Sequence, residues 1–204
     1  MAVRSQNSTK TKTLILDAAR RQFAHYGFSK VTMDEIAQDA ALGKASIYYY
    51  FPTKENLFQA VMTSEHDRFM KQLEGMIGMK IGAAAKIREY VLERHEYFKK
   101  MLNLNILDLR SSASMKPIFA ETYERFAKQE LGLLRRLLKQ GCESGEFSVR
   151  SIDRVAVGLM HTMQGLRCRF LRAIQGPPAE SDGYDQLKEE IGFVADIFLN
   201  GIRK

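Results

Sequence analysis

Two short helices joined by a tight turn are predicted by the stretch Thr32-Met-Asp-Glu-Ile-Ala-Gln-Asp-Ala-Ala-Leu-Gly-Lys-Ala-Ser-Ile-Tyr-Tyr-Tyr-Phe51. Glu35 stands three residues after Thr32, which is the spacing of a capping box. In such a box each side chain accepts a hydrogen bond from the other residue's backbone N–H group. The apolar residues that follow give this first helix a small inward face. The stretch therefore opens with a well-defined helix start.

The second half of the stretch predicts the turn and the second helix. Gly43 is expected to supply the positive φ of the turn, because other residues resist that conformation. The helix then runs over 44–51, with Ile47 and Phe51 as buried anchors one turn apart. Pro52 ends it, because proline cannot continue the hydrogen-bond ladder. This layout is typical of a helix-turn-helix, which places its second helix in a DNA major groove.

The outward face of the second helix carries groups that suit DNA. Lysine neutralises phosphates or donates to guanine, small residues allow a close approach to the bases, and tyrosine hydroxyls reach phosphates. Thr53 is expected to cap the next helix, whose first turn contains Lys54 and favours a phosphate. The alternative is a short amphipathic helix with a polar outer face, but the caps, turn and following helix all agree with the DNA-binding reading. The predicted DNA-binding residues are Thr32, Gly43, Lys44, Ala45, Ser46, Tyr48, Tyr49 and Lys54.

Residues 11–58 resemble the N-terminal domain of the TetR family of bacterial transcription regulators. The chain departs from the family at Tyr50, where histidine is common, and at Pro52, where lysine or serine is common. The resemblance implies an all-helical dimer with a DNA-binding head and a larger C-terminal domain that binds an inducing ligand. It is carried by Ile15-Leu-Asp-Ala-Ala-Arg-Arg-Gln-Phe-Ala-His-Tyr-Gly27, Thr32-Met-Asp-Glu-Ile-Ala37, Lys44-Ala-Ser-Ile-Tyr-Tyr-Tyr-Phe51 and Thr53-Lys-Glu-Asn-Leu-Phe58.

Apolar residues recur at helical spacing along nearly the whole chain, so we predict an all-α fold. A head formed by residues 1–53, comprising an N-terminal arm and a three-helix DNA-binding domain, precedes a helical effector-binding and dimerisation domain, residues 54–204. The first helix is expected to bury Leu14, Ile15, Ala18, Ala19, Phe23 and Tyr26 and to end at Gly27. The other helices are expected at about 54–73, 83–102, 117–142, 152–174 and 184–202, with a glycine joint at Gly75, Gly78 and Gly82 and a turn at 145–147 that returns Phe147 to the core.

Composition agrees with this prediction. The 204 residues are 45% apolar and carry a net charge of +7, which suits a polyanionic partner. Basic residues dominate up to Lys30. The arm ahead of the first helix, which is expected to begin at about Thr9, either follows the DNA backbone or enters the adjacent minor groove, the alternative being a solvated, disordered tail. No apolar run is long enough for a membrane span and no leader is visible, so we expect a cytoplasmic protein. Cys142 and Cys168 are expected to be reduced thiols, a disulfide being the less favoured alternative.

The last two helices are expected to form a homodimer interface. A four-helix interface would result if each chain contributed both, whereas the alternative is that they close the monomer's own core. The resemblance favours the dimer, which would read a near-palindromic operator in double-stranded DNA. The apolar positions are Val155, Leu159, Met163, Leu166 and Phe170, followed by Leu187, Ile191, Val194, Ala195, Phe198 and Ile202.

A pocket for an unidentified, largely apolar small molecule is expected among the central helices. Aromatic and methionine side chains line such pockets, with a few fixed polar groups, and an arginine there would favour an anion. The alternative, which the residue types favour for most of these positions, is ordinary core. The predicted effector-binding residues are Phe69, Tyr97, Met101, Arg110, Phe119, Tyr123, Met160, Met163 and Arg167, with His161 and Arg169 as further polar candidates.

Enzymatic readings find no support in the sequence. The four histidines have no metal-ligand spacing, and no nucleophile elbow or phosphate-binding glycine loop is present. We therefore predict no catalytic residues, no metal and no cofactor. The predicted function is a ligand-responsive repressor that releases its operator when the effector binds. The alternative is a structural or interaction protein with a TetR-like fold and weak or non-specific DNA binding.

Overall fold

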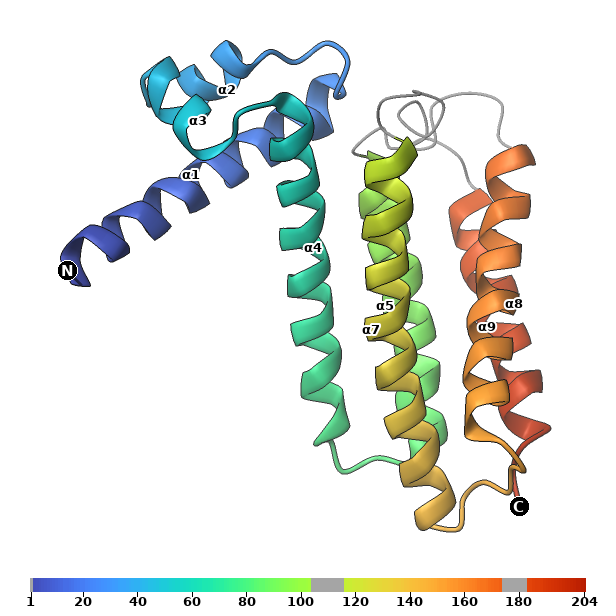
Figure 1. Ribbon diagram of the computed structural model, residues 1–204. Helices are drawn as coiled ribbons and strands as arrows, with labels where there is room; N and C mark the ends of the chain where they lie inside the picture. The colour runs from blue at the N-terminus through green and yellow to red at the C-terminus, as the bar shows by residue number, and fades with distance from the viewer. Residues whose placement is uncertain (1, 104–115, 174–182) are drawn as a thin grey trace. The chain divides into compact units, whose positions relative to one another are not determined.

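The computed structural model describes residues 2–103, 116–173 and 183–204, with side chains described for 8–100, 120–172 and 183–204. Every long regular element in these ranges is an α-helix (Figure 1), which confirms the all-α prediction. An isolated bridge joins Phe147 to Arg203. The helices are α1 (Ala2–Tyr26), α2 (Met33–Asp39), α3 (Lys44–Tyr50), α4 (Lys54–Ile77), α5 (Ala83–Asn103), α7 (Lys116–Glu143), α8 (Ile152–Ala173) and α9 (Gly183–Asn200).

The chain forms two compact units. The first contains residues 1–68 and 101–123, and the second contains residues 69–100 and 124–204. Helix α4 begins in the first unit and ends in the second. The domain boundary expected after residue 53 stays a prediction.

An aromatic cluster forms the centre of the first unit. Phe23 on α1, Phe28 in the following loop and Phe58 on α4 lie with ring centroids 5.1–5.7 Å apart. The burial of these three rings supplies a large part of the hydrophobic stabilisation of the small helical head. The predicted anchors of α3 are confirmed, since Ile47 and Phe51 are both buried. The other buried apolar residues of α1, α2 and α4 here include Ile15, Ala18, Ala19, Met33, Ile36, Leu57 and Val61.

The predicted inward stripe of α1 is wrong at both ends. Leu14 and Tyr26 are each 53% exposed, whereas Ile15 and Phe23 are fully buried. Successive residues of a helix are turned by about 100°, so Leu14 points away from the face that Ile15 buries. Tyr26 is the last residue of the helix, just before Gly27, whose φ of +79° confirms the predicted helix end.

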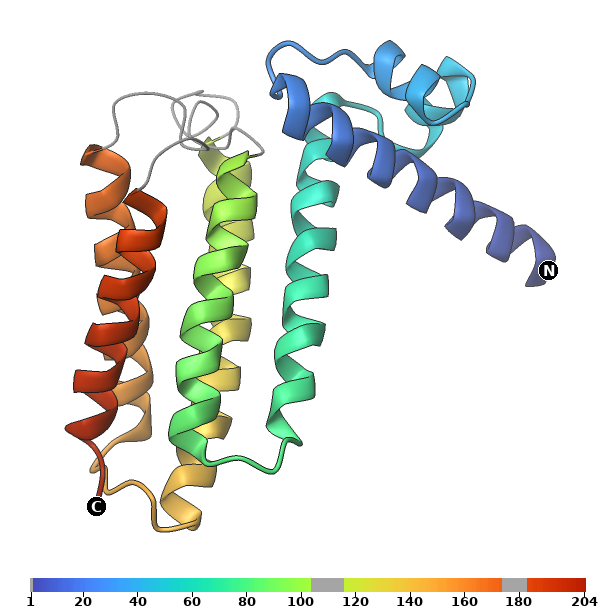
Figure 2. The same cartoon turned by 180° about the vertical axis from the view of Figure 1, so that it is seen from behind.

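Four helices make up most of the second unit. α5, α7, α8 and α9 run along a common direction, as both views show (Figures 1 and 2). The end of α4 joins them, because Phe69 stacks on Tyr97 with ring centroids 4.6 Å apart and Gln72 donates to Glu93 over 2.7 Å. The buried apolar side chains of these helices include Ile87, Val91, Phe126, Leu133, Leu134, Leu137, Leu138, Ala156, Leu159, Leu187, Ile191 and Ala195.

The loop after α7 closes one end of this unit. Gly145 has a φ of +78° and Phe147 is buried, which confirms the predicted turn. The Glu146 carboxylate accepts hydrogen bonds from the backbone N–H groups of Ala83 and Ala84, over 2.6 and 3.0 Å. This carboxylate therefore caps α5 from a segment distant in sequence, at the end where a negative charge is favoured.

The glycine joint is only partly as predicted. Gly75 lies inside α4, which continues to Ile77, while Gly78 and Gly82 lie in the connection to α5. No helix within the described ranges has both the length and the apolar character that crossing a bilayer requires.

Candidate nucleic-acid interface and ligand site

The first helix of the predicted motif begins with the expected capping box. The Glu35 N–H donates to Thr32 Oγ1 over 3.2 Å, and the Thr32 N–H donates to Glu35 Oε2 over 2.7 Å. The backbone hydrogen bond from Thr32 is the main reason why the pKa of Glu35 lies below its usual value. The Thr32 hydroxyl also donates to Glu35, over 2.8 Å, and the residue is exposed. Its contact with DNA stays a prediction.

The turn between α2 and α3 corrects the prediction for Gly43. The positive φ, +52°, belongs to Ala41, whereas Gly43 has a φ of −69° and is the N-cap of α3. Helix α2 ends in a Schellman arrangement, with Leu42 N–H bonded to the Ala37 carbonyl over 2.9 Å and Ala41 N–H to Gln38 over 3.0 Å. That arrangement requires the left-handed conformation directly after the C-cap, so it falls on Ala41 at a cost of about 1 kcal/mol.

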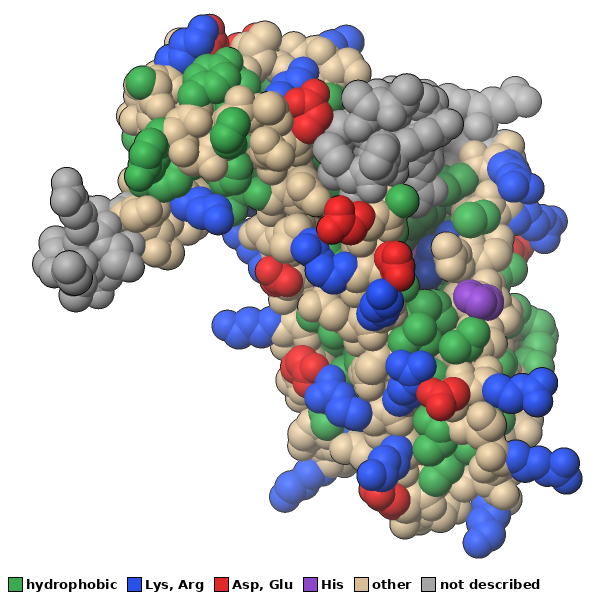
Figure 3. Space-filling view, in the orientation of Figure 1, with side chains coloured by type: hydrophobic (Ala, Val, Ile, Leu, Met, Phe, Trp, Pro, Cys, Tyr) green, Lys and Arg blue, Asp and Glu red, His purple; other side chains and the backbone are tan. Residues whose placement is uncertain are grey.

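Helix α3 presents a tyrosine-bearing outer face. Tyr49 is 82% exposed and Tyr48 41% exposed, and Lys44 and Ala45 are exposed as well. Figure 3 shows hydrophobic side chains, a class that there includes tyrosine, at the surface over α2 and α3. Ser46 is half-buried, and so it contributes less surface than its neighbours. Gly43 is also exposed, and no atom lies within 4 Å of the position that a Cβ would take.

Tyr50, which the sequence left unplaced, is half-buried at the end of α3. Its ring lies edge-on to that of Tyr49, with centroids 5.1 Å apart. This contact supports the exposed Tyr49 ring from one side and restricts the directions that it can take.

An acid that the sequence reading overlooked accompanies Lys44. Its ammonium lies 2.8 Å from a carboxylate oxygen of Asp34 on α2, and this hydrogen bond is the main cause that raises the pKa of Lys44. Both side chains are exposed, so the pair contributes little stability. Asp34 therefore competes with any phosphate or base edge for the Lys44 ammonium.

The Lys54 side chain is turned into the fold. Its ammonium donates to the carbonyl oxygens of Phe28 and Val31, over 2.8 and 2.9 Å, and lies 4.4 Å from the centre of the Phe28 ring. It thus holds the loop between α1 and α2 against the start of α4. Thr53 Oγ1 accepts from the Asn56 N–H over 3.1 Å, which confirms the predicted cap. Phosphate binding at Lys54 stays a prediction. Because the ammonium is bound within the fold, this prediction depends on the backbone N–H groups of the first turn of α4.

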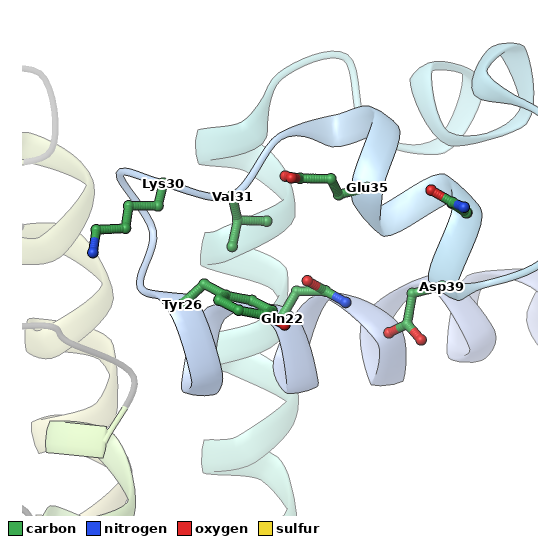
Figure 4. Close-up of a pocket in the computed structure, with 7 residues that line it drawn as sticks. Gln22, Tyr26, Lys30, Val31, Glu35 and Asp39 are labelled. Atoms are coloured by element: carbon green, nitrogen blue, oxygen red, sulfur yellow. The ribbon is translucent and has the colours of Figure 1, made fainter.

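A hollow opens at the surface between α1 and α2 (Figure 4). Gln22 and Tyr26 of α1 face Glu35 and Asp39 of α2 across it, with Lys30 and Val31 from the loop at one end. Most of the lining residues are polar, Val31 is buried, and none of them was among the predicted ligand-binding residues.

The predicted effector residues fall into four groups. Phe69, Tyr97, Met163 and Arg167 are buried in the second unit, and Met160 is half-buried there. Tyr123 is half-buried in the first unit. His161 and Arg169 are exposed. Met101, Arg110 and Phe119 lie outside the residues whose side chains the structure describes.

A buried polar cluster lies among α5, α7 and α8. Glu130 Oε2 accepts from the Tyr90 hydroxyl over 2.8 Å and from Arg94 Nε over 2.7 Å. Burial is the main cause that raises the pKa of Tyr90 well above its usual value. Arg167 interacts electrostatically with this group and is itself buried. Sequence reasoning found only Arg167, although the i,i+4 spacing of Tyr90 and Arg94 was a readable signal.

The two cysteines, Cys142 and Cys168, are half-buried free thiols. Among the residues that the structure describes, no group of three His, Cys, Asp or Glu side chains is arranged to hold a metal ion.

Comparison with known proteins finds similarity to transcription regulators. The model of the family "bacterial regulatory proteins, tetR family" matches residues 15–61. A transcriptional regulator from Cytophaga hutchinsonii is 36% identical, and its crystal structure aligns over 94% of this chain and 98% of its own with a TM-score of 0.86. The transcriptional repressor NicS from Pseudomonas putida is 24% identical over 99% of this chain and 97% of its own length.

A further solved structure, SmeT in complex with triclosan, shares 22% identity and a TM-score of 0.70 over 96% of this chain and 92% of its own. SmeT is the repressor of a multidrug efflux pump of Stenotrophomonas maltophilia. At this identity the likeness concerns the fold alone.

Proposed function

The chain belongs to the TetR family of bacterial transcription regulators, and on that premise we propose that it is a repressor that releases its operator when a small molecule binds the second unit. The observation that carries the proposal is the outer face of α3, where exposed tyrosines accompany a lysine and the helix has no acidic residue. The proposed activity is binding, without catalysis, in the cytoplasm of a bacterium.

Each predicted DNA contact has a distinct role in this proposal. Tyr48 and Tyr49 donate to phosphates and fix the register of α3, while Lys44 reaches a phosphate or a guanine edge. Ala45 and Ser46 are small enough for the helix to approach the bases. Gly43 adds open space at the N-terminus of α3, and Thr32 and Lys54 contribute at the starts of α2 and α4.

The test is binding to the DNA upstream of the protein's own gene, measured by fluorescence anisotropy at several salt concentrations. We expect tight binding that weakens steeply with salt, by about one unit of logarithmic slope for each neutralised phosphate. A random duplex of equal length should bind about 1000-fold more weakly at physiological salt. Equal affinity for both duplexes would instead favour the structural or interaction protein.

We also propose a homodimer through α8 and α9, which would read a near-palindromic site. Phe193 and Ile197, one turn apart on α9, are 66% and 56% exposed. Large apolar side chains exposed at this spacing are typical of a helix–helix interface. Neither residue is among the interface positions predicted from the sequence, several of which, such as Leu187 and Ile191, are instead buried in the monomer's own core. We therefore propose that α9 closes the monomer's own core with one face and forms the dimer interface with the other.

Replacing Phe193 by aspartate is expected to convert the dimer into a monomer, because the charge would be buried against the partner. Light scattering should report half the mass of the wild-type protein, and operator affinity should fall because one head alone remains. Gln129→Asp adds the same charge at an exposed position of α7, outside the proposed interface, and serves as the control. An unchanged mass for Phe193→Asp would place the interface elsewhere.

For the response to ligand, we propose that α4 carries the signal. The helix begins in the first unit and ends in the second, where Phe69 stacks on Tyr97 of α5. A ligand shifts the equilibrium only if it prefers one arrangement of the heads over the other. A coupling of about 1–3 kcal/mol would change operator affinity about 5–150-fold. A saturating ligand that left operator affinity unchanged would contradict this coupling.

A further inference from the structure

The Arg167 side chain on α8 is the most unusual polar group of the second unit. The residue is only 7% exposed, and its Nε and Nη2 atoms are buried without a hydrogen-bond partner in the described part of the chain. These two nitrogens form one edge of the guanidinium plane, with parallel N–H bonds. That edge matches the two oxygens of a carboxylate, which accept both bonds at once. The unsatisfied atoms therefore have the geometry of an anion-binding edge.

Among the residues that the structure describes, no carboxylate is hydrogen-bonded to this edge. Glu130 is the acid that interacts with Arg167, but its Oε2 already accepts from Tyr90 and from Arg94. The half-buried guanidinium of Arg94 and the buried guanidinium of Arg167 thus share the Glu130 carboxylate. Burial, and then the charge of Arg94, lower the pKa of Arg167 to about 9, so the group is still a cation at neutral pH. A buried cation with unmade hydrogen bonds is costly, and an additional anion would remove that cost.

Other unpartnered polar atoms lie nearby. His95 Nδ1 and the Tyr184 hydroxyl are buried without a partner in the described residues, and the two rings lie 6.4 Å apart. Burial, followed by the charge of Arg167, lowers the pKa of His95, which is therefore neutral at pH 7. Burial likewise raises the pKa of Tyr184 to about 12, and so its hydroxyl keeps its proton. Both side chains can donate a hydrogen bond to an acceptor.

Aromatic side chains also lie in these surroundings. Phe98 on α5 lies 5.9 Å from the guanidinium carbon of Arg167, and Phe170, one turn along α8, lies 4.9 Å from Tyr184. Such walls favour an apolar body and tolerate few further polar groups. The site therefore combines one anion-binding edge, two neutral donors and aromatic rings.

We propose that the effector is a carboxylate with an apolar body, held by the Nε–Nη2 edge of Arg167, with His95 and Tyr184 as additional donors. The inference deepens the proposed function and rests on it, since it names the class of ligand that the second unit takes. The carboxylate supplies the negative charge that this cluster lacks, and the apolar body lies against the aromatic side chains.

The test compares two carboxylates with their neutral analogues by calorimetry on the full-length protein. The probes are decanoate and 4-phenylbutyrate, with decan-1-ol and 4-phenylbutan-1-ol as the analogues. We expect at least one carboxylate to bind about 10-fold or more tightly than its alcohol. Arg167→Met should weaken carboxylate binding about 10–100-fold and leave alcohol binding within about 3-fold. Arg167→Lys keeps the charge but loses the bidentate edge, so its carboxylate affinity should lie between those of the wild type and Arg167→Met.

Arg169→Met is the matched control, because Arg169 lies on the same helix and is exposed. It should bind carboxylates like the wild-type protein. Ligand-free Arg167→Met should melt at the same temperature as the wild type or higher, because an unpaired buried charge has been removed. A lower melting temperature would show that the guanidinium serves the fold, and would overturn the proposal.

Three other results would overturn the proposal as well. They are equal affinity for carboxylates and alcohols, full carboxylate affinity in Arg167→Met, and the absence of carboxylate binding at millimolar concentration. Operator affinity is measured separately with and without the carboxylate. Carboxylate binding that depends on Arg167 but leaves operator affinity unchanged supports this site and refutes the proposed release mechanism.

Discussion

Replacing Lys44 and Tyr49 together by alanine is expected to weaken operator binding about 100-fold, the largest effect that any pair of exposed side chains in the head should produce. Tyr49 is 82% exposed on α3, and its hydroxyl has the reach to donate to a phosphate. Lys44, on the same helix, supplies a charge that DNA attracts. Loss of both removes one phosphate anchor and one cation from the surface that we propose lies in the major groove.

The fold should tolerate this change, which makes the result interpretable. Neither side chain is buried, and the exposed ion pair between Lys44 and Asp34 contributes little stability. The melting temperature should therefore stay within about 2 °C of the wild-type value. Fluorescence anisotropy would give the affinity, and the salt slope should fall by about one unit with the loss of Lys44.

Asp34→Asn is the matched variant that is expected to change DNA affinity in the opposite direction. It removes the acid that lies 2.8 Å from the Lys44 ammonium, and so we expect about 3-fold tighter binding to operator and random DNA alike. If the double alanine variant kept wild-type affinity, the α3 face would not be the DNA-binding surface. If Asp34→Asn weakened binding, Asp34 would instead be needed to orient Lys44.

The local features of the head were predictable from the sequence because they depend on neighbouring residues. The Thr32–Glu35 capping box, the end of α3 before Pro52 and the Thr53 cap each involve groups at most three residues apart. The burial of Ile47 follows from helical spacing alone. The prediction that Gly43 has the positive φ was wrong, and the reason is again local. Residue type favoured glycine, whereas the Schellman end of α2 requires the positive φ at Ala41.

Features that depend on distant segments could not be predicted in the same way. The direction of the Lys54 ammonium is set by two carbonyl groups 23 and 26 residues earlier in the chain. The Glu146 cap on α5 joins residues more than 60 positions apart. Arg167 was chosen from the sequence as an arginine near aromatic residues, but its unsatisfied edge follows from how α5, α7 and α8 bring Arg94 and Glu130 beside it.

Replacing Gly141 by alanine is expected to destabilise the protein by about 3 kcal/mol, although alanine is the better helix former. Gly141 lies in the last turns of α7, where a Cβ would overlap two atoms of the Phe147 ring and approach the Cβ of Ala83 to 2.9 Å. For a chain of this length such a loss lowers the melting temperature by about 6–12 °C, which differential scanning calorimetry would measure.

The ring of Phe147 cannot move aside at low cost, because its backbone is held from two directions. The N–H groups of Glu146 and Phe147 both donate to the Gly141 carbonyl, over 2.9 and 3.0 Å. On the other side, Ser148 donates to Ile202 over 2.9 Å, and Lys204 donates to Glu146 over 3.2 Å. Relief of the overlap would therefore disturb the Glu146 cap on α5 and the contact with the C-terminal residues together.

Gly132→Ala is the control that separates steric overlap from helix propensity. Gly132 lies on the same helix, with no atom within 4 Å of the position of its Cβ, so alanine there should raise the free energy of unfolding by about 0.5–1 kcal/mol. Helix propensity alone predicts stabilisation for both variants, whereas the packing of Phe147 predicts opposite signs. Stabilisation by Gly141→Ala would mean that the loop after α7 does not pack against α7 and α5 as described, and that the cap on α5 has to be supplied by another group.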